Sequence, residues 1–128
     1  MPTPHPVKLT APAERGSVRL VRILAAGVAA NAGLSIDDTE DLRIAVSELV
    51  ALLVDGVDHD ATIEVEFTHA AGEVVVEGRR PAVNGRPDPA GVDDLVRGIL
   101  RVVVDDHTFD DGDTGRQFRI VKRARDAS

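Results

Sequence analysis

Apolar residues recur at three- and four-residue steps between Ser35 and Gly56, which predicts one long amphipathic helix. Its apolar stripe comprises Leu42, Ala45, Val46, Leu49 and Leu53, widened by Ile44, Ala51 and Leu52. Ser35 is a favourable N-cap residue, and Gly56 stands where a left-handed residue commonly ends a helix. One carboxylate, Glu48, lies in the apolar second half of this helix. This residue is either a solvated or paired carboxylate at the margin of the stripe, without a function, or a candidate general base.

The rest of the chain alternates between helical and strand-like patterns. Helical periodicity also predicts helices over 13–32 and 93–106. Strands are predicted over 7–11, 61–69, 74–77, 107–109 and 114–123. Pro and Gly dominate residues 79–93, which are predicted to form a loop. The basic residues of the last strand are interpreted as charges that protect a sheet edge, with a docking surface as the alternative.

This order of elements predicts an α+β fold, a two-layer sandwich with three helices on one face of a mixed, mostly antiparallel sheet. The chain has 128 residues, of which 43% are hydrophobic, enough for the core of one domain. We assign the domain to residues 7–124, with a flexible N-terminus over 1–6 and a C-terminal tail over 125–128. The prolines among the first six residues favour an extended, mobile segment.

Composition narrows the classes of function. The net charge of −7 disfavours nucleic-acid binding, which needs a basic surface. The chain has no cysteine, and its four histidines are scattered, so neither a thiol nor a zinc site is predicted. The acidic run at 110–113 lacks the ligand spacing of a calcium loop. No secretory signal or membrane-spanning stretch is apparent, so we expect a cytoplasmic protein that does not enter membranes.

The central helix resembles the first ATP-site helix of the GHKL superfamily, the histidine-kinase-like ATPases, and in particular that of bacterial anti-sigma-factor serine kinases. Their helix runs D-x-x-x-A-V-x-E-x-x-x-N. Asp41, Ala45, Val46 and Glu48 match this pattern, whereas its Asn falls on Leu52. The resemblance extends over about residues 7–124 in the order and length of the elements. It implies the histidine-kinase-like ATPase fold.

The positions that the resemblance implies for nucleotide binding depart from the family pattern. The family Asn is implied to hold the magnesium of Mg-ATP, and Leu52 has no oxygen or nitrogen to offer a cation. An Asp-x-Gly-x-Gly motif, implied to read adenine and approach the nucleotide, falls near Gly78, Arg80 and Ala82. A second Gly-x-Gly turn, implied to wrap the phosphates, falls on Asp94 and Val96. The resemblance thus predicts a degenerate ATP site, with no metal and no confident cofactor-binding residue.

The resulting hypothesis is an anti-sigma-factor-like regulator of transcription that acts by protein–protein binding, without a cofactor. Its implied partners are a sigma factor, an anti-anti-sigma protein or both. One alternative is an active serine/threonine protein kinase that uses Mg-ATP. Glu48 would be its general base, by carry-over from the family, and Asp88 or Asp93 would replace the lost ligand. A second alternative is a non-enzymatic interaction module that forms a homodimer through the third helix or an edge strand. Whether the protein is an enzyme stays open at this stage.

Overall fold

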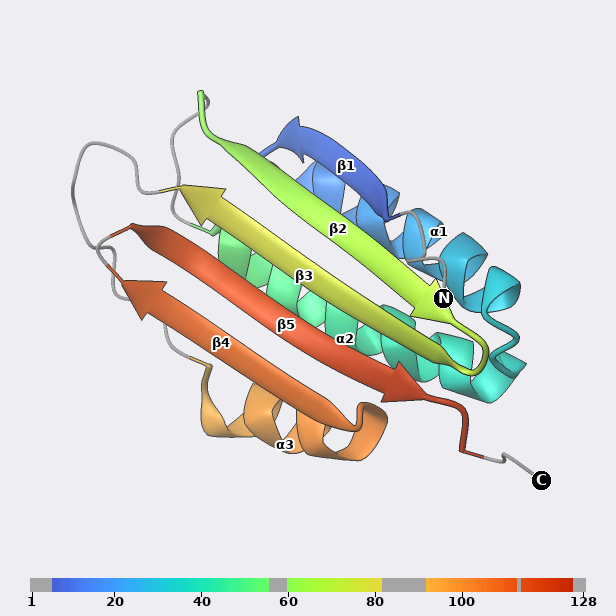
Figure 1. Cartoon of the computed structure of the whole chain (residues 1–128). Helices are drawn as coiled ribbons and strands as arrows, with labels where there is room; N and C mark the ends of the chain where they lie inside the picture. Colours follow the sequence, from blue (N-terminus) through green and yellow to red (C-terminus); the bar gives the residue numbers. More distant parts are fainter. Residues whose placement is uncertain (1–5, 56–59, 82–91, 113, 126–128) are drawn as a thin grey trace.

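The computed structural model describes residues 6–55, 60–81, 92–112 and 114–125 as three helices and five strands (Figure 1). In chain order they are β1 (Val7–Pro12), α1 (Arg15–Asn31), α2 (Ile36–Val54), β2 (Thr62–Ala70), β3 (Glu73–Pro81), α3 (Asp94–Val103), β4 (Asp106–Gly112) and β5 (Gly115–Arg123). Of the expected flexible N-terminus and C-terminal tail, residues 1–5 and 126–128 lie outside the described part. The predicted helix-ending residue, Gly56, lies outside it as well.

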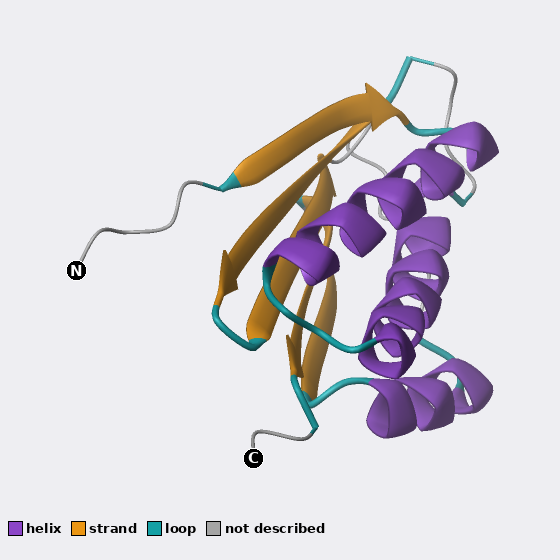
Figure 2. Ribbon diagram, turned by 90° about the vertical axis from the view of Figure 1, so that its right-hand side faces the viewer, coloured by secondary structure: helices purple, strands orange, loops and turns teal. Residues whose placement is uncertain are grey.

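The five strands form one sheet in the order β1-β2-β3-β5-β4, and each neighbouring pair is antiparallel. All three helices cover the same face of this sheet (Figure 2). Helix α2 packs over β3 and β5, with α1 on one side of it, over β1 and β2, and α3 on the other, near β4. The two-layer fold is therefore as predicted, although the five described strands are antiparallel throughout and the sheet is not mixed.

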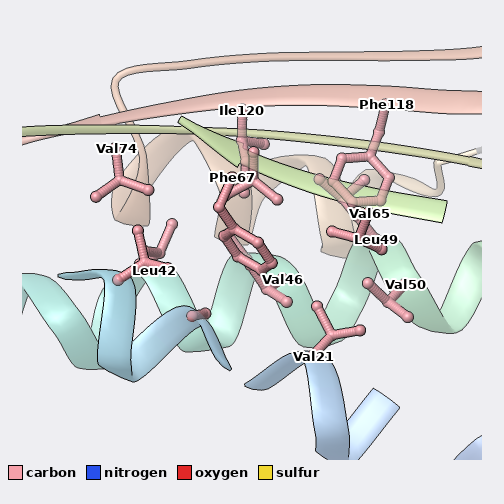
Figure 3. Packing of buried hydrophobic residues seen from close by; sticks show 14 of the residues in the cluster. Val21, Leu42, Val46, Leu49, Val50, Val65, Phe67, Val74, Phe118 and Ile120 are labelled. Atoms are coloured by element: carbon pink, nitrogen blue, oxygen red, sulfur yellow. The ribbon is translucent and has the colours of Figure 1, made fainter. Parts of the chain in front are cut away.

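Helix α2 holds the centre of the core. Its predicted stripe is buried at Leu42, Ala45, Val46, Leu49 and Leu53. Figure 3 shows Leu42, Val46 and Leu49 beside inward-facing residues of the sheet. Ser35 caps the helix as predicted, since its Oγ accepts a hydrogen bond from the Asp38 N–H. The predicted widening of the stripe is wrong at Ile44 and Ala51, which are exposed, because they lie on the flank of the helix that faces away from the sheet.

Strand β5 is internal, between β3 and β4, so the interpretation of its charges as edge protection is wrong. Alternation along β5 puts Arg116 and Lys122 on the same inner face as Phe118 and Ile120, and each of these two cations is 2% exposed.

The predicted loop over 79–93 also begins too early. Strand β3 continues through Pro81 because β5 supplies a pairing partner as far as Gly115. Strand β4 likewise runs to Gly112, beyond residue 109, where the predicted strand ends.

The buried Lys122 ties the end of β5 to the start of α2. Its Nζ lies 3.6 Å from Oδ1 of Asp38 and 3.5 Å from Oδ2 of Asp41. The Asp38 carboxylate also accepts a hydrogen bond from the backbone N–H of Arg125, at 3.1 Å. Burial raises the pKa of Asp38, but the Arg125 N–H, the Lys122 charge, the Ser35 contact and the Arg125 charge outweigh it and hold the pKa below its ordinary value of 3.8.

Because the folded-state pKa of Asp38 is lowered, its carboxylate stabilises the fold at neutral pH and loses this effect in acid. The contribution is complete above about pH 5 and is lost as the pH falls through the folded-state pKa. We expect Asp38→Asn to lower the free energy of unfolding at pH 7 and to flatten its decline between pH 5 and pH 3. Urea unfolding across this range measures both effects. Asp37→Asn, at an exposed neighbour, is the control; an equal flattening in both variants would contradict the assignment to Asp38.

Candidate functional site

Glu48 lies in the second half of α2 and is half-buried. Ile44 and Leu52 lie one helical turn before and after Glu48. Ile44 is 42% exposed, and Leu52 is half-buried. Glu48 makes no hydrogen bond or ion pair with any residue in the described part of the chain. The carboxylate is thus free to accept a proton or a hydrogen bond from solvent or a bound group.

Leu52 stands where the family is implied to hold magnesium, and its backbone carbonyl accepts a hydrogen bond within the protein. Its carbonyl oxygen accepts a hydrogen bond of 2.6 Å from Nη1 of Arg116, and the Asp55 carbonyl accepts a second from the same nitrogen at 3.0 Å. Both carbonyls belong to the C-terminal end of α2, where backbone acceptors lack helical partners and a cation is favourable. The guanidinium of Arg116 therefore joins β5 to the end of the helix that carries Glu48.

At the position near which the family places its adenine-reading Asp, Gly78 has no room for a side chain. Gly78 is paired with Phe118 across β3 and β5. A Cβ added to Gly78 would lie 2.3 Å from Cε2 of Phe118 and 3.1 Å from Cδ1 of Leu53. Carbon atoms in contact are normally about 3.5–4.0 Å apart. The phenyl ring therefore fills the space into which a residue 78 side chain would project.

Apart from the half-buried Val96, the remaining motif positions are polar or lie outside the described residues. Arg80 stands near the first family glycine, is 5% exposed, and faces Arg116 directly in the strand register. Ala82 and Asp88 are not among the described residues. Asp93 caps α3 by accepting a hydrogen bond from the Val96 N–H at 2.8 Å. Asp94 is exposed in the first turn of α3, where the family is implied to wrap phosphates with glycines.

The structure brings together two groups that the sequence interpretation missed, the buried guanidinium groups of Arg80 and Arg116. The sequence did contain a signal that Arg116 is buried. Inward and outward positions alternate along β5, so position 116 shares the inner face with Phe118 and Ile120. Long-range pairing then puts Arg80 opposite it, and a single strand's pattern does not reveal that pairing. Within the described residues, no group of three or more His, Asp or Glu side chains could hold a metal ion. Nor does any described helix have the length and hydropathy to span a membrane.

Comparison with known proteins gives two informative matches, although no family model matches the chain. The serine-protein kinase RsbW of Halalkalibacterium halodurans is 35% identical over 65 residues, which cover 50% of this chain and 40% of that protein. The crystal structure of the RsbU and RsbW domains of Rv1364c from Mycobacterium tuberculosis aligns with a TM-score of 0.69 and 19% identity. It covers 97% of this chain and 35% of the other.

The chain is similar to RsbW over about half of its own length. The local identity to RsbW supports this relationship, and the structural match, being below 25% identity, supports the fold alone. The predicted fold is thereby confirmed, and the similarity to RsbW agrees with the predicted family resemblance. This RsbW-like chain spans about 40% of the length of the curated relative that it matches.

Proposed function

We propose that this protein is an anti-sigma-type regulator of transcription that acts by binding a protein partner, and that its ATP site is degenerate. The relationship to RsbW supports the regulatory class. The observation that carries the second part is the packing of Phe118 and Leu53 against Gly78, at the position where the family is implied to read adenine.

Three contributions to nucleotide binding and phosphoryl transfer are altered together. Leu52 offers no side-chain ligand to magnesium, and no residue other than glycine fits at position 78 without a clash. Asp94 brings a negative charge to the region implied to hold phosphates. Because phosphoryl transfer depends on positioning and electrostatic stabilisation, the loss of all three disfavours kinase activity.

The helical layer offers surfaces suited to a protein partner. Large apolar side chains are exposed on all three helices, at Leu20, Ile23, Ile36, Ile44, Leu95 and Val102. Exposed apolar groups of this size are common at protein-binding surfaces when they gather into patches. A sigma factor or an anti-anti-sigma protein is the proposed partner, and the cytoplasm is the proposed location.

Thermal unfolding with and without millimolar Mg-ATP or Mg-ADP tests the proposal. We expect no shift of the midpoint for this protein. A nucleotide at a hundredfold excess over its dissociation constant would add about 2.7 kcal/mol, which is roughly 5 °C or more for a domain of this size. RsbW of Halalkalibacterium halodurans is the positive control. A sigma factor that binds the protein equally well with and without nucleotide would support the proposal further.

A clear nucleotide shift would instead favour the kinase alternative, for which the half-buried Glu48 and the relative's kinase name are the supporting observations. In that case Glu48→Gln should abolish phosphate transfer to an anti-anti-sigma protein while preserving the nucleotide shift. Transfer that continues unchanged in this variant would exclude Glu48 as the general base.

A further inference from the structure

We propose that an exposed surface shared by α2 and α3 binds an amphipathic helix of a partner protein, with a Lys or Arg of that helix paired to Glu48. This α2–α3 surface comprises Ile44, Glu48, Leu52, Leu95, Ile99 and Val102. The inference rests on the proposed function for the existence of a protein partner, and it names the side of the molecule on which that partner docks. The surface combines apolar side chains with one carboxylate, which determines the chemistry that its partner needs.

Helix α2 turns Glu48 and Leu52 towards α3. Helices α1 and α3 lie on opposite sides of α2 (Figure 1). Val50 of α2 lies beside Val21 of α1 (Figure 3). Successive helical residues are rotated by about 100°, so Glu48 and Leu52 point about 160° away from Val50, to the side of α3. Ile44, one turn before Glu48, continues this line and is 42% exposed.

Helix α3 presents an apolar flank to the outside of the helical layer. Leu95, Ile99 and Val102 recur at four- and three-residue steps and therefore share one flank of the helix. Leu95 and Val102 are each 74% exposed, and Ile99 is half-buried. In Figure 1, α3 lies below α2, behind the sheet, and runs in the opposite direction to α2. In this orientation a right-handed helix turns its two arginines towards the sheet edge and its apolar flank away from the sheet, to the outer side where α2 exposes Ile44.

The opposite directions of the two helices bring their apolar positions into correspondence. Leu52, near the end of α2, lies towards Leu95 at the start of α3, and Ile44 lies towards Val102 near its end. Glu48 stands between these two pairs. Exposed apolar side chains that are scattered singly are ordinary, whereas those that gather beside one another are typical of protein-binding surfaces.

The charges around the α2–α3 surface favour a basic partner. Glu48 makes no hydrogen bond or ion pair with another described residue, and the exposed carboxylates of Asp55 and Asp94 make no ion pair there. A nucleic acid, or the same surface of a second copy, would bring further negative charge to this place. A cationic amphipathic helix instead matches both the apolar side chains and the free carboxylate.

Binding of labelled helical peptides, followed by fluorescence anisotropy, tests the surface. The probe is an amphipathic peptide of Leu and Lys. Its controls are a peptide with Glu in place of Lys and a peptide with the Leu and Lys order scrambled. We expect the probe to bind at least about tenfold more tightly than either control, because only the probe matches the surface in both charge and apolar spacing.

Val102→Gln should weaken binding of the Leu/Lys peptide about tenfold, because it removes apolar area that the peptide would cover. Ile36→Gln is the matched control. It removes an apolar side chain that is 83% exposed at the start of α2, away from the α2–α3 surface, and it should leave binding unchanged. Equal weakening in these two variants would overturn the proposal, as would a scrambled peptide that binds as tightly as the probe.

Glu48→Lys tests the charge pairing. It should reverse the preference, so that the Glu-containing peptide binds more tightly than the Leu/Lys peptide. Asp37→Lys makes the same kind of substitution at an exposed position about three turns away on α2, and it should leave the preference as it is. A preference for Lys that persists in Glu48→Lys would contradict the pairing with Glu48.

Two further outcomes separate this surface from its alternatives. A dimer that light scattering detects and Val102→Gln dissociates would overturn the proposal, because a second copy would then occupy the surface. If the peptides do not bind, while a sigma factor does and nucleotides still give no thermal shift, the docking surface is refuted and the proposed function stands.

Discussion

Replacing Arg116 with methionine is expected to lower the free energy of unfolding by about 3 kcal/mol, as estimated from the loss of a buried charge with several partners. The guanidinium is 2% exposed and donates to the carbonyls of Leu52 and Asp55. Methionine fills much of the same volume but donates no hydrogen bond. The substitution therefore leaves polar groups at the end of α2, and the nearby Asp111 carboxylate, without the cation that they face in the folded protein.

Two further variants show how much of the lost stability comes from the hydrogen bonds of Arg116 and how much from strand propensity or charge. Arg119→Met changes the same residue type on the same strand at an exposed position, and we expect a change within about 0.5 kcal/mol. Arg116→Lys keeps the charge but lacks the planar fork, so it should recover only part of the loss. Urea unfolding midpoints at pH 7 measure all three. If Arg116→Met and Arg119→Met are equally stable, the link between β5 and α2 contributes little.

The helices and strand β2 were predictable because their signals are local. The stripe from Leu42 to Leu53 follows helical periodicity, and Ser35 has the side chain that an N-cap requires. The alternation of Ile63, Val65 and Phe67 with polar residues likewise identified β2 and its buried face. In each case the evidence lies within one element, where spacing along the chain determines which side chains share a face.

The place of β5 in the sheet was not predictable in this way. Its cations read as protection of an edge, yet the strand lies between β3 and β4, and Arg116 and Lys122 point inward. These two are accommodated by partners distant in sequence, the end of α2 for Arg116 and the start of α2 for Lys122. The family pattern identified Leu52 and Gly78 as departures, but only the packing of Phe118 and Leu53 shows what occupies the space at position 78.

Two glycines of this chain, alike in the sequence, are expected to respond oppositely to the same substitution. Gly27 lies in the interior of α1, is exposed, and would have nothing within 4 Å of an added Cβ. Gly27→Ala should therefore stabilise the protein by about 0.5–1 kcal/mol, the usual helix-interior preference. Because Gly27 faces solvent, the added methyl group meets no neighbouring side chain.

Gly78→Ala is expected to destabilise the protein by about 1–3 kcal/mol, because the new methyl group would overlap the ring of Phe118. Ring carbons 2.3 Å and 2.6 Å from the added Cβ must move, and Cδ1 of Leu53, 3.1 Å from it, crowds the new methyl group further. Urea unfolding of the two alanine variants, side by side, gives the sign of each effect. Equal changes in both would show that glycine flexibility, rather than the aromatic ring, determines the response.

The double variant Gly78→Ala, Phe118→Leu identifies the ring as the cause. If the clash is with the phenyl group, the two substitutions together should cost less than the sum of the single effects, since removing the ring makes room for the methyl group. Additive losses would contradict this coupling. A positive result would also bear on the ATP site. It would mean that a carboxylate near residue 78, as in the family pattern, cannot be introduced while Phe118 is present. Recovery of adenine recognition would then require substitutions at both positions.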